Sequence, residues 1–111
     1  MPRDDSTLLD LQKSARLAAE FLGDLDLPAF MSDAKTQSAV LHQLLLLGEG
    51  VKRLSQEFRE ANASIPWRLM AGMRDNLIHE YDTVDIEQVY ETVRRDVPKL
   101  MNFLTSVVPK L

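Results

Sequence analysis

Apolar residues recur at steps of three and four along most of this chain, and that period constrains the fold more than any other feature of the sequence. Such spacing places apolar side chains on one face of an α-helix, whereas a half-buried strand alternates with a period of two. No alternating segment, internal repeat or low-complexity stretch is present. The 111 residues are therefore predicted to form a single all-α domain, residues 1–111, folded as an antiparallel bundle of about four to five helices.

Local signals mark the ends of the first two predicted helices. The first spans residues 7–22, with Asp5 or Ser6 as its N-cap and Gly23 as its stop. The second is long: it follows Asp33 and runs to about Arg59. Both segments are amphipathic, so each should bury one face against the rest of the bundle.

The third and fourth helices also carry recognisable signals. Pro66 suits the first turn of the third helix, which should end near Tyr81. Asp85 and Gln88 form a capping-box-like start for the last helix. Pro98 lies inside that helix and should kink it, because its ring conflicts with the carbonyl of Arg94.

The apolar faces of these helices predict the core. Gly48 and Gly50 lie within the long second helix, where each costs about 1 kcal/mol relative to alanine, so a close approach of another element is expected there. That element is either a helix of the same protomer or a second copy. The predicted core faces are Leu8, Leu11, Ala15, Ala18 and Leu22, then Val40, Leu44, Leu47, Val51, Leu54 and Phe58, and finally Ile86, Val89, Val93, Val97, Leu100, Leu104 and Val107.

Residues 65–82 contain the candidate site. Arg74 falls in the middle of the apolar arc of this helix, where a charged guanidinium is costly unless an anion meets it. His79 follows five residues later, and Tyr81 lies two residues beyond it. A cation, a group that titrates near neutral pH and a phenol thus lie within eight residues. Trp67, at the start of the same helix, is predicted to be a core or interface residue rather than a platform for stacking bases.

The sequence around this site resembles the signature of HepT-like proteins, which belong to the HEPN superfamily. Further similarity covers residues 38–50, 84–85 and 96–100, so it extends over most of the chain. The motifs that carry the resemblance are Arg74-x4-His79-x-Tyr81, Ile65-Pro66-Trp67 and Gly72-Met73-Arg74-Asp75.

The resemblance implies a fold, an activity and partners. The implied fold is the HEPN helical bundle, and the implied activity is metal-independent endoribonuclease cleavage by the toxin of a toxin–antitoxin module. The implied assembly is a homodimer in which the motifs of two protomers line one cleft. The implied antitoxin is a minimal nucleotidyltransferase that attaches AMP to Tyr81, and an anionic nucleotide there would occlude the phosphate site of Arg74.

Arg74 and His79 suit the two tasks of metal-free RNA cleavage. The 2′-hydroxyl attacks the adjacent phosphorus, so His79 would move protons and Arg74 would hold the charge on the phosphoryl oxygens. Five residues on a helix correspond to about 140° around the axis, so the two side chains converge only if the helix end loosens or if two copies contribute. The alternative without catalysis is an Arg74 ion pair inside the bundle and a surface His79.

Neighbouring polar residues could support this pair. Asp75 and Asp82 are spaced to orient the imidazole of His79, although an acid beside Arg74 also weakens its attraction for phosphate. Arg68 and Asn76 could line the cleft. Tyr81 is either a half-buried core residue or, as the resemblance implies, a hydroxyl reachable at the cleft edge.

The charge of the chain gives no general attraction for nucleic acid. The net charge of −4 means that RNA contacts would have to come from a local patch, for which Lys52 and Arg53, together with Arg59, are candidates. Zero cysteines exclude disulfides and thiolate metal sites. His42 and Glu49 share a helix face without a third ligand, so neither a metal site nor a cofactor is expected.

A cytoplasmic protein outside the membrane is expected from the remaining features. The charged N-terminus lacks the apolar core of a signal peptide, and the longest aliphatic run, residues 44–47, is too short to span a bilayer. Besides the nuclease, two other functions stay open. One is a non-catalytic HEPN module that binds a nucleotidyltransferase partner or a nucleotide, and the other is a dimeric helical adaptor with no role on nucleic acid.

Overall fold

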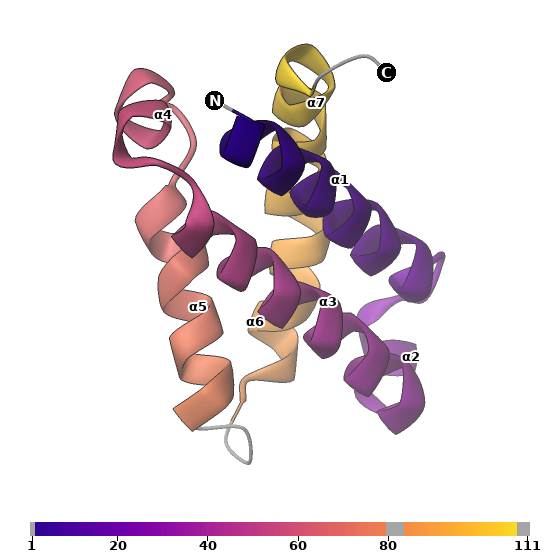
Figure 1. Cartoon of the computed structure of the whole chain (residues 1–111). Coiled ribbons are helices and arrows are strands. Elements are labelled where there is room, and N and C mark those ends of the chain that lie inside the picture. The colour runs from indigo at the N-terminus through magenta and orange to yellow at the C-terminus, as the bar shows by residue number, and fades with distance from the viewer. Residues whose placement is uncertain (1, 80–83, 109–111) are drawn as a thin grey trace.

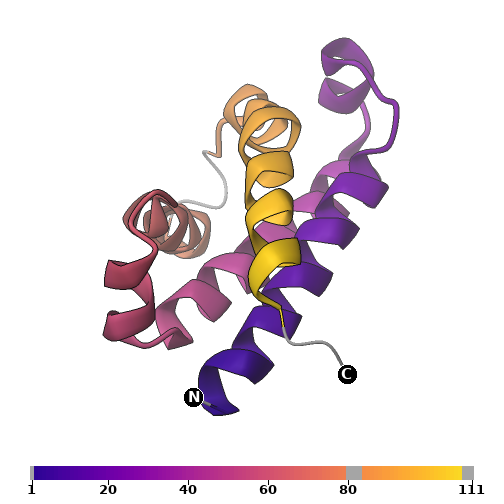
Figure 2. The same ribbon diagram turned by 90° about the horizontal axis from the view of Figure 1, so that it is seen from above.

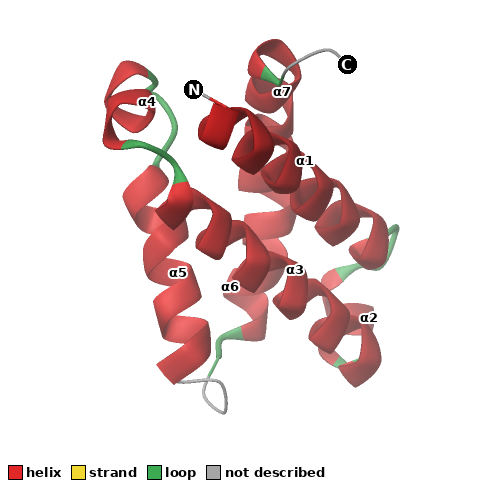
Figure 3. Cartoon of the chain, viewed as in Figure 1, coloured by secondary structure: helices red, strands yellow, loops and turns green. Residues whose placement is uncertain are grey.

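The computed structural model describes residues 2–79 and 84–108. Within these residues every regular element is a helix and none is a strand (Figure 3), which confirms the predicted all-α class. None of the described helices is both long and apolar enough to cross a membrane. In chain order the elements are α1 (Pro2–Leu22), α2 (Leu27–Met31), α3 (Ala34–Arg53), α4 (Gln56–Ala61), α5 (Trp67–His79), α6 (Ile86–Glu91), the π-helical turn η2 (Thr92–Asp96) and α7 (Val97–Val107).

Two long helices, α1 and α3, form the centre of the bundle. They lie side by side and run in opposite directions (Figure 1). α5 packs mainly on α3, and α7 packs on α1. Seen from above, α6, η2 and α7 follow one another as one rod that runs across the α1–α3 pair (Figure 2). The structure is therefore a helical bundle in which α3 supports α5, the helix that carries the candidate site.

The core consists largely of the predicted apolar faces. Phe30 of α2 joins them and has no solvent exposure, with its ring centroid 5.9 Å from that of Tyr90. Its burial was not predicted, because a single helical turn is too short to show a period. The predicted residues that are buried are Leu8, Leu11, Ala15, Ala18 and Leu22 of α1, Val40, Leu44, Leu47 and Val51 of α3, Leu54 just after it, and Val89, Val93, Val97, Leu100 and Leu104 of the rod.

The start of the first helix was predicted wrongly. α1 begins at Pro2, so Asp5 and Ser6 lie inside the helix and neither is its N-cap. Proline is tolerated in a first turn and acidic residues there complement the helix dipole, so the charged N-terminal residues favour helix. Asp4 is buried, and its carboxylate accepts hydrogen bonds from the backbone N–H of Ser55 at 2.9 Å and from its hydroxyl at 2.7 Å. This contact anchors the beginning of α1.

The long second helix was also predicted wrongly, because it is divided in two. α3 ends at Arg53, Leu54 has extended backbone with a ψ of 143°, and α4 begins after Ser55. The hydroxyl of Ser55 accepts a hydrogen bond from the N–H of Phe58 at 3.1 Å, which is the usual N-cap contact. Ser55 was the available signal, since serine is favoured at an N-cap and is neutral at best inside a helix.

A π-helical turn, η2, interrupts the last predicted helix just before Pro98. The N–H of Val97 donates to the carbonyl of Thr92, five residues earlier, so the backbone is widened by one residue before the proline. Pro98 then occupies the first turn of α7, where its missing N–H is not needed. The N-cap at Asp85 is as predicted: its carboxylate accepts from the N–H of Gln88 at 3.2 Å.

Candidate functional site

The N-terminal end of α5 is fixed by Trp67. Its side chain is buried, its indole N–H donates to the carbonyl of Asn62 at 3.1 Å, and its ring packs near those of Phe58 and Phe103. These contacts confirm a core role for Trp67. A fixed first turn sets both the position and the rotation of the helix that follows.

Two glycines of α3 allow close packing inside the protomer. A Cβ built on Gly48 would lie 2.2 Å from the Cβ of Arg74 and 3.1 Å from the carbonyl oxygen of Met70. A Cβ on Gly50 would lie 2.6 Å from a methyl carbon of Leu11. Of the two interpretations of these glycines, the structure therefore bears out packing within one protomer. Gly48 is the point at which α5 rests on α3.

Beyond this helix contact, the guanidinium of Arg74 is hydrogen-bonded to two carboxylates. Its Nε donates to Oε1 of Glu49 at 2.8 Å, and its Nη2 donates to the same oxygen. Its Nη1 donates to Oδ1 of Asp75 at 3.0 Å. The side chain is 23% exposed, and these carboxylates, Glu49 first, raise the pKa of Arg74 above its ordinary value. The ion pair within the bundle, which was expected under the alternative without catalysis, is thus present.

Asp75 connects Arg74 to a second cation. The ammonium of Lys52, near the end of α3, donates to Oδ1 of Asp75 at 2.6 Å. The hydrogen bonds from Lys52, and then from Arg74, lower the pKa of Asp75. Glu49, Arg74, Asp75 and Lys52 therefore form one network that joins α3 to α5, and we call it the α3–α5 ion network. Its two cations and two carboxylates cancel in formal charge.

The structure describes only some of the other predicted site residues. Arg68 and Asn76 are exposed on α5. Arg53 is engaged with Asp10 of α1 at 3.6 Å. α5 remains helical as far as His79, whose side chain is outside the part that the structure describes, as are Tyr81 and Asp82 altogether. The helix end is therefore not loosened before His79, and positions 74 and 79 lie about 140° apart around its axis.

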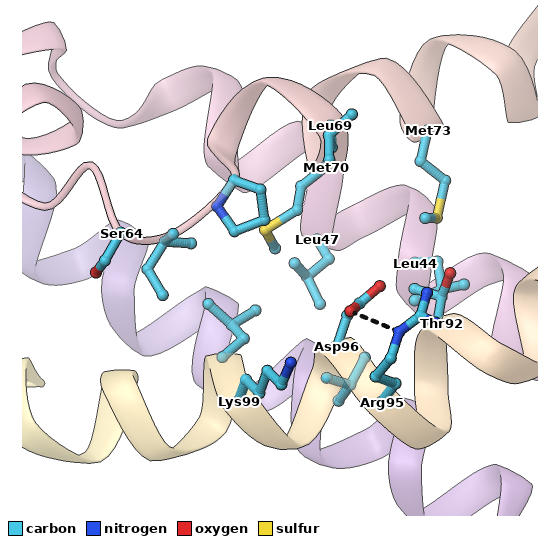
Figure 4. Close-up of a pocket in the computed structure, with 15 residues that line it drawn as sticks. Leu44, Leu47, Ser64, Leu69, Met70, Met73, Thr92, Arg95, Asp96 and Lys99 are labelled. Carbon is cyan, nitrogen blue, oxygen red and sulfur yellow. Dashed lines mark hydrogen bonds and ion pairs between the residues drawn. The ribbon is translucent and has the colours of Figure 1, made fainter.

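A groove of about 360 Å³ opens beside the network, between α5 and the η2–α7 part of the rod (Figure 4). Its floor is formed by α3, including Gly48, and its α5 wall includes Leu69, which is 72% exposed. Arg95 and Asp96, an ion pair at 3.4 Å, line the opposite wall. The complete lining is Leu44, Leu47, Gly48, Ser64, Ile65, Pro66, Leu69, Met70, Met73, Thr92, Arg95, Asp96, Val97, Lys99 and Leu100.

The family model described as ribonuclease HepT-like matches residues 11–107, which include all the helices of the bundle in whole or in part. This chain belongs to the HepT-like family. The match includes the network and α5, so the resemblance noted in the sequence is confirmed.

Named relatives of this HepT-like chain agree with that assignment. A protein of Thermococcus cleftensis named "Probable ribonuclease HepT" is 40% identical over 93 residues, which cover 84% of each chain. A protein of Methanocaldococcus jannaschii named "Putative RNase MJ0127" is 32% identical over 110 residues, covering 97% of this chain and 91% of the relative. No solved structure matches this chain significantly.

Two features of the candidate site were missed in the sequence. Glu49 was considered only as a metal ligand, and its pairing with Arg74 across 25 positions could not be read from a local pattern. The available signal was its place directly after Gly48, the predicted point of close approach. The groove was missed because it arises where α5 and η2–α7 stay apart, which depends on three elements distant in sequence.

Proposed function

We propose that this chain is a cytoplasmic, metal-independent endoribonuclease in which Arg74 and His79 act on the scissile phosphate. The observation that carries the proposal is the placement of Arg74: its stem is locked on Gly48 while the guanidinium remains partly exposed on a helix that continues to His79. The family assignment and the ribonuclease names of the relatives support the same activity.

The proposed chemistry needs only protein groups and the RNA. The 2′-hydroxyl loses its proton to an imidazole and attacks the adjacent phosphorus, the bond from phosphorus to the 5′-oxygen breaks, and that oxygen leaves with a proton donated by an imidazolium. The products are a cyclic phosphate end and a 5′-hydroxyl end. Arg74 stabilises the charge that develops on the phosphoryl oxygens, and its planar fork matches two of them.

A homodimer with a composite site is part of the proposal. Positions 74 and 79 lie about 140° apart around the axis of a helix that is intact between them. One α5 therefore does not direct both groups at the same phosphate, whereas two copies related by a two-fold axis can each contribute one group. Arg68 and Asn76, exposed on the same helix, are the proposed neighbours of the RNA. Lys52 is already paired with Asp75, so we do not include Lys52 among the proposed direct RNA contacts, and Asp75 keeps its proposed role of orienting His79.

Cleavage in excess EDTA tests the proposed function. The unmodified protein should cut an RNA oligomer in EDTA at the rate seen without chelator, leaving cyclic phosphate ends. The same oligomer with 2′-O-methyl groups should remain intact, because the attacking hydroxyl is blocked. Products are resolved by gel electrophoresis and their ends by mass spectrometry. Cleavage that stops in EDTA, or that continues on the methylated oligomer, would contradict the proposed chemistry.

Regulation by a nucleotidyltransferase antitoxin is the second part of the proposal. Tyr81 is close to Arg74 in the sequence. An AMP group attached to Tyr81 would therefore add a phosphate near the proposed site and block access to it. Coexpression with the cognate enzyme should add one AMP to the wild-type protein and abolish its cleavage. Tyr81→Phe should cleave as the wild type does and stay unmodified and active after coexpression. Silencing of Tyr81→Phe by coexpression would place the modification elsewhere.

A non-catalytic binding module is the second candidate function, and one observation favours it. The guanidinium of Arg74 is already paired with Glu49 and Asp75, and the α3–α5 ion network has no net formal charge, so it offers little long-range attraction to phosphate. Under this alternative the unmodified protein binds a nucleotidyltransferase or a nucleotide and leaves all RNAs intact. The EDTA experiment separates the two functions.

A further inference from the structure

We infer that Glu49 is a positioning residue for Arg74, which fixes the edge of the guanidinium that faces the substrate phosphate. The inference deepens the proposed nuclease function and rests on it. Glu49 itself needs no contact with RNA. Its role follows from the hydrogen bonds of the α3–α5 ion network and from its place next to Gly48.

The hydrogen bonds divide the guanidinium into two parts. Arginine has five N–H donors, and three are engaged by described residues: Nε and one donor of Nη2 by Glu49, and one donor of Nη1 by Asp75. Within the part of the chain that the structure describes, one donor remains on each terminal nitrogen. Two donors on the terminal nitrogens form the fork that binds two oxygens of a phosphate. Glu49, by holding the Nε side, keeps one donor of each terminal nitrogen available to the substrate.

The backbone contact beneath this pair makes the arrangement rigid. Glu49 directly follows Gly48, where the two helices touch at the Cβ of Arg74, so the carboxylate and the stem of the arginine are both fixed to the same point of α3. The side chain of Glu49 is 36% exposed, and that of Arg74 is 23% exposed. Charge-assisted hydrogen bonds at a partly buried site are about twice as strong as neutral ones, so they restrict the rotamers of a long side chain effectively.

The negative charge of Glu49 next to the proposed phosphate site has a cost in RNA binding, which steady-state kinetics should reveal. A carboxylate beside a phosphate site weakens the attraction of the RNA in its ground state. If Glu49 only repelled RNA, its removal would raise both affinity and turnover. If it positions Arg74, neutralising it should leave KM unchanged or lower while kcat falls, because the arginine is no longer held in the orientation that the transition state needs.

Two variants and one matched control test this inference. Glu49→Ala should lower kcat by about 10- to 100-fold, the usual effect of losing a residue that orients a site group, and Glu49→Gln should fall between it and the wild type because an amide oxygen still accepts weakly. Neither should raise KM. The control Glu20→Gln removes a carboxylate from an exposed pair with Arg16 on α1 and should leave kcat unchanged. A kcat for Glu49→Ala within about twofold of the wild type, or above it, would overturn the inference.

A second measurement does not depend on cleavage. In ¹⁵N NMR spectra the Nε–H of Arg74, assigned with Arg74→Lys, should exchange slowly with water in the wild type and in Glu20→Gln, and rapidly in Glu49→Ala. Equal exchange in the wild type and Glu49→Ala would refute the positioning role whether or not RNA is cut. Slow exchange in a wild type that cuts no RNA would refute the nuclease proposal, and with it catalytic positioning, while leaving the orienting contact established.

Discussion

Replacing Arg74 with alanine should lower RNA cleavage by about 10³-fold, and replacing His79 with alanine should lower it by about 10²- to 10⁴-fold. The two losses have different causes. Arg74→Ala removes the donors that stabilise charge on the phosphoryl oxygens, whereas His79→Ala removes the group that moves protons. Arg74→Lys should recover little, because a single ammonium does not reproduce the planar fork. Cleavage is measured in EDTA under single-turnover conditions, with circular dichroism and light scattering to confirm fold and assembly.

Mixing the two inactive variants tests the composite site. If each site takes Arg74 from one protomer and His79 from the other, a mixed dimer contains one site with both residues intact. Random exchange makes about half of the dimers mixed, each with one of its two sites active, so the mixture should recover about a quarter of wild-type activity. No recovery, with exchange of protomers verified, would contradict the contribution of two copies. Unchanged cleavage by either single variant would contradict the assigned catalytic pair.

The predicted helices succeeded where the evidence is local and repeated. A helix face with five regularly spaced apolar positions is stable only when it packs against the core. The faces that include Leu11 and Leu100 are therefore buried as expected. The ends of helices depend on single residues, and there the prediction was right at Asp85 and wrong at the start of α1 and within the long helix. Ser55 divides the long helix because its hydroxyl caps α4 and its N–H and hydroxyl also bind Asp4, a partner 51 positions away that no local pattern indicates.

The candidate site shows the same division between local and distant information. Arg74 was predicted from its position in an apolar arc, and Gly48 from its cost in a helix, but nothing in the sequence indicated that these two residues meet. Their contact is made between two helices, and it brings Glu49 of α3 within reach of the guanidinium, alongside Asp75 of α5. The site is therefore best understood as a property of the α3–α5 packing, of which the signature in residues 65–82 supplies one half.

Gly48→Ala should accordingly damage both stability and activity. A methyl group at Gly48 would lie 2.2 Å from the Cβ of Arg74, whereas carbon atoms in contact prefer about 3.5–4.0 Å, so α5 must move away by more than about 1 Å. The Cβ of Arg74 is bonded directly to the backbone, so it can move only if α5 moves with it. Overpacking of this kind costs about 1–3 kcal/mol, against a gain of about 1 kcal/mol in helix propensity. We expect a net loss of stability in urea unfolding, and about 10²-fold slower cleavage because the guanidinium is displaced.

Gly72→Ala provides the matched control, because it makes the same substitution in α5 itself. A Cβ at Gly72 meets no heavy atom within 4 Å among the described residues, so only the gain in helix propensity remains, and stability should rise by about 1 kcal/mol. A Gly48→Ala protein as stable and as active as the wild type would show that α5 can shift on α3 without consequence. In that case the position of Arg74 would not depend on the glycine, and the rigid contact that we infer beneath Glu49 would be wrong as well.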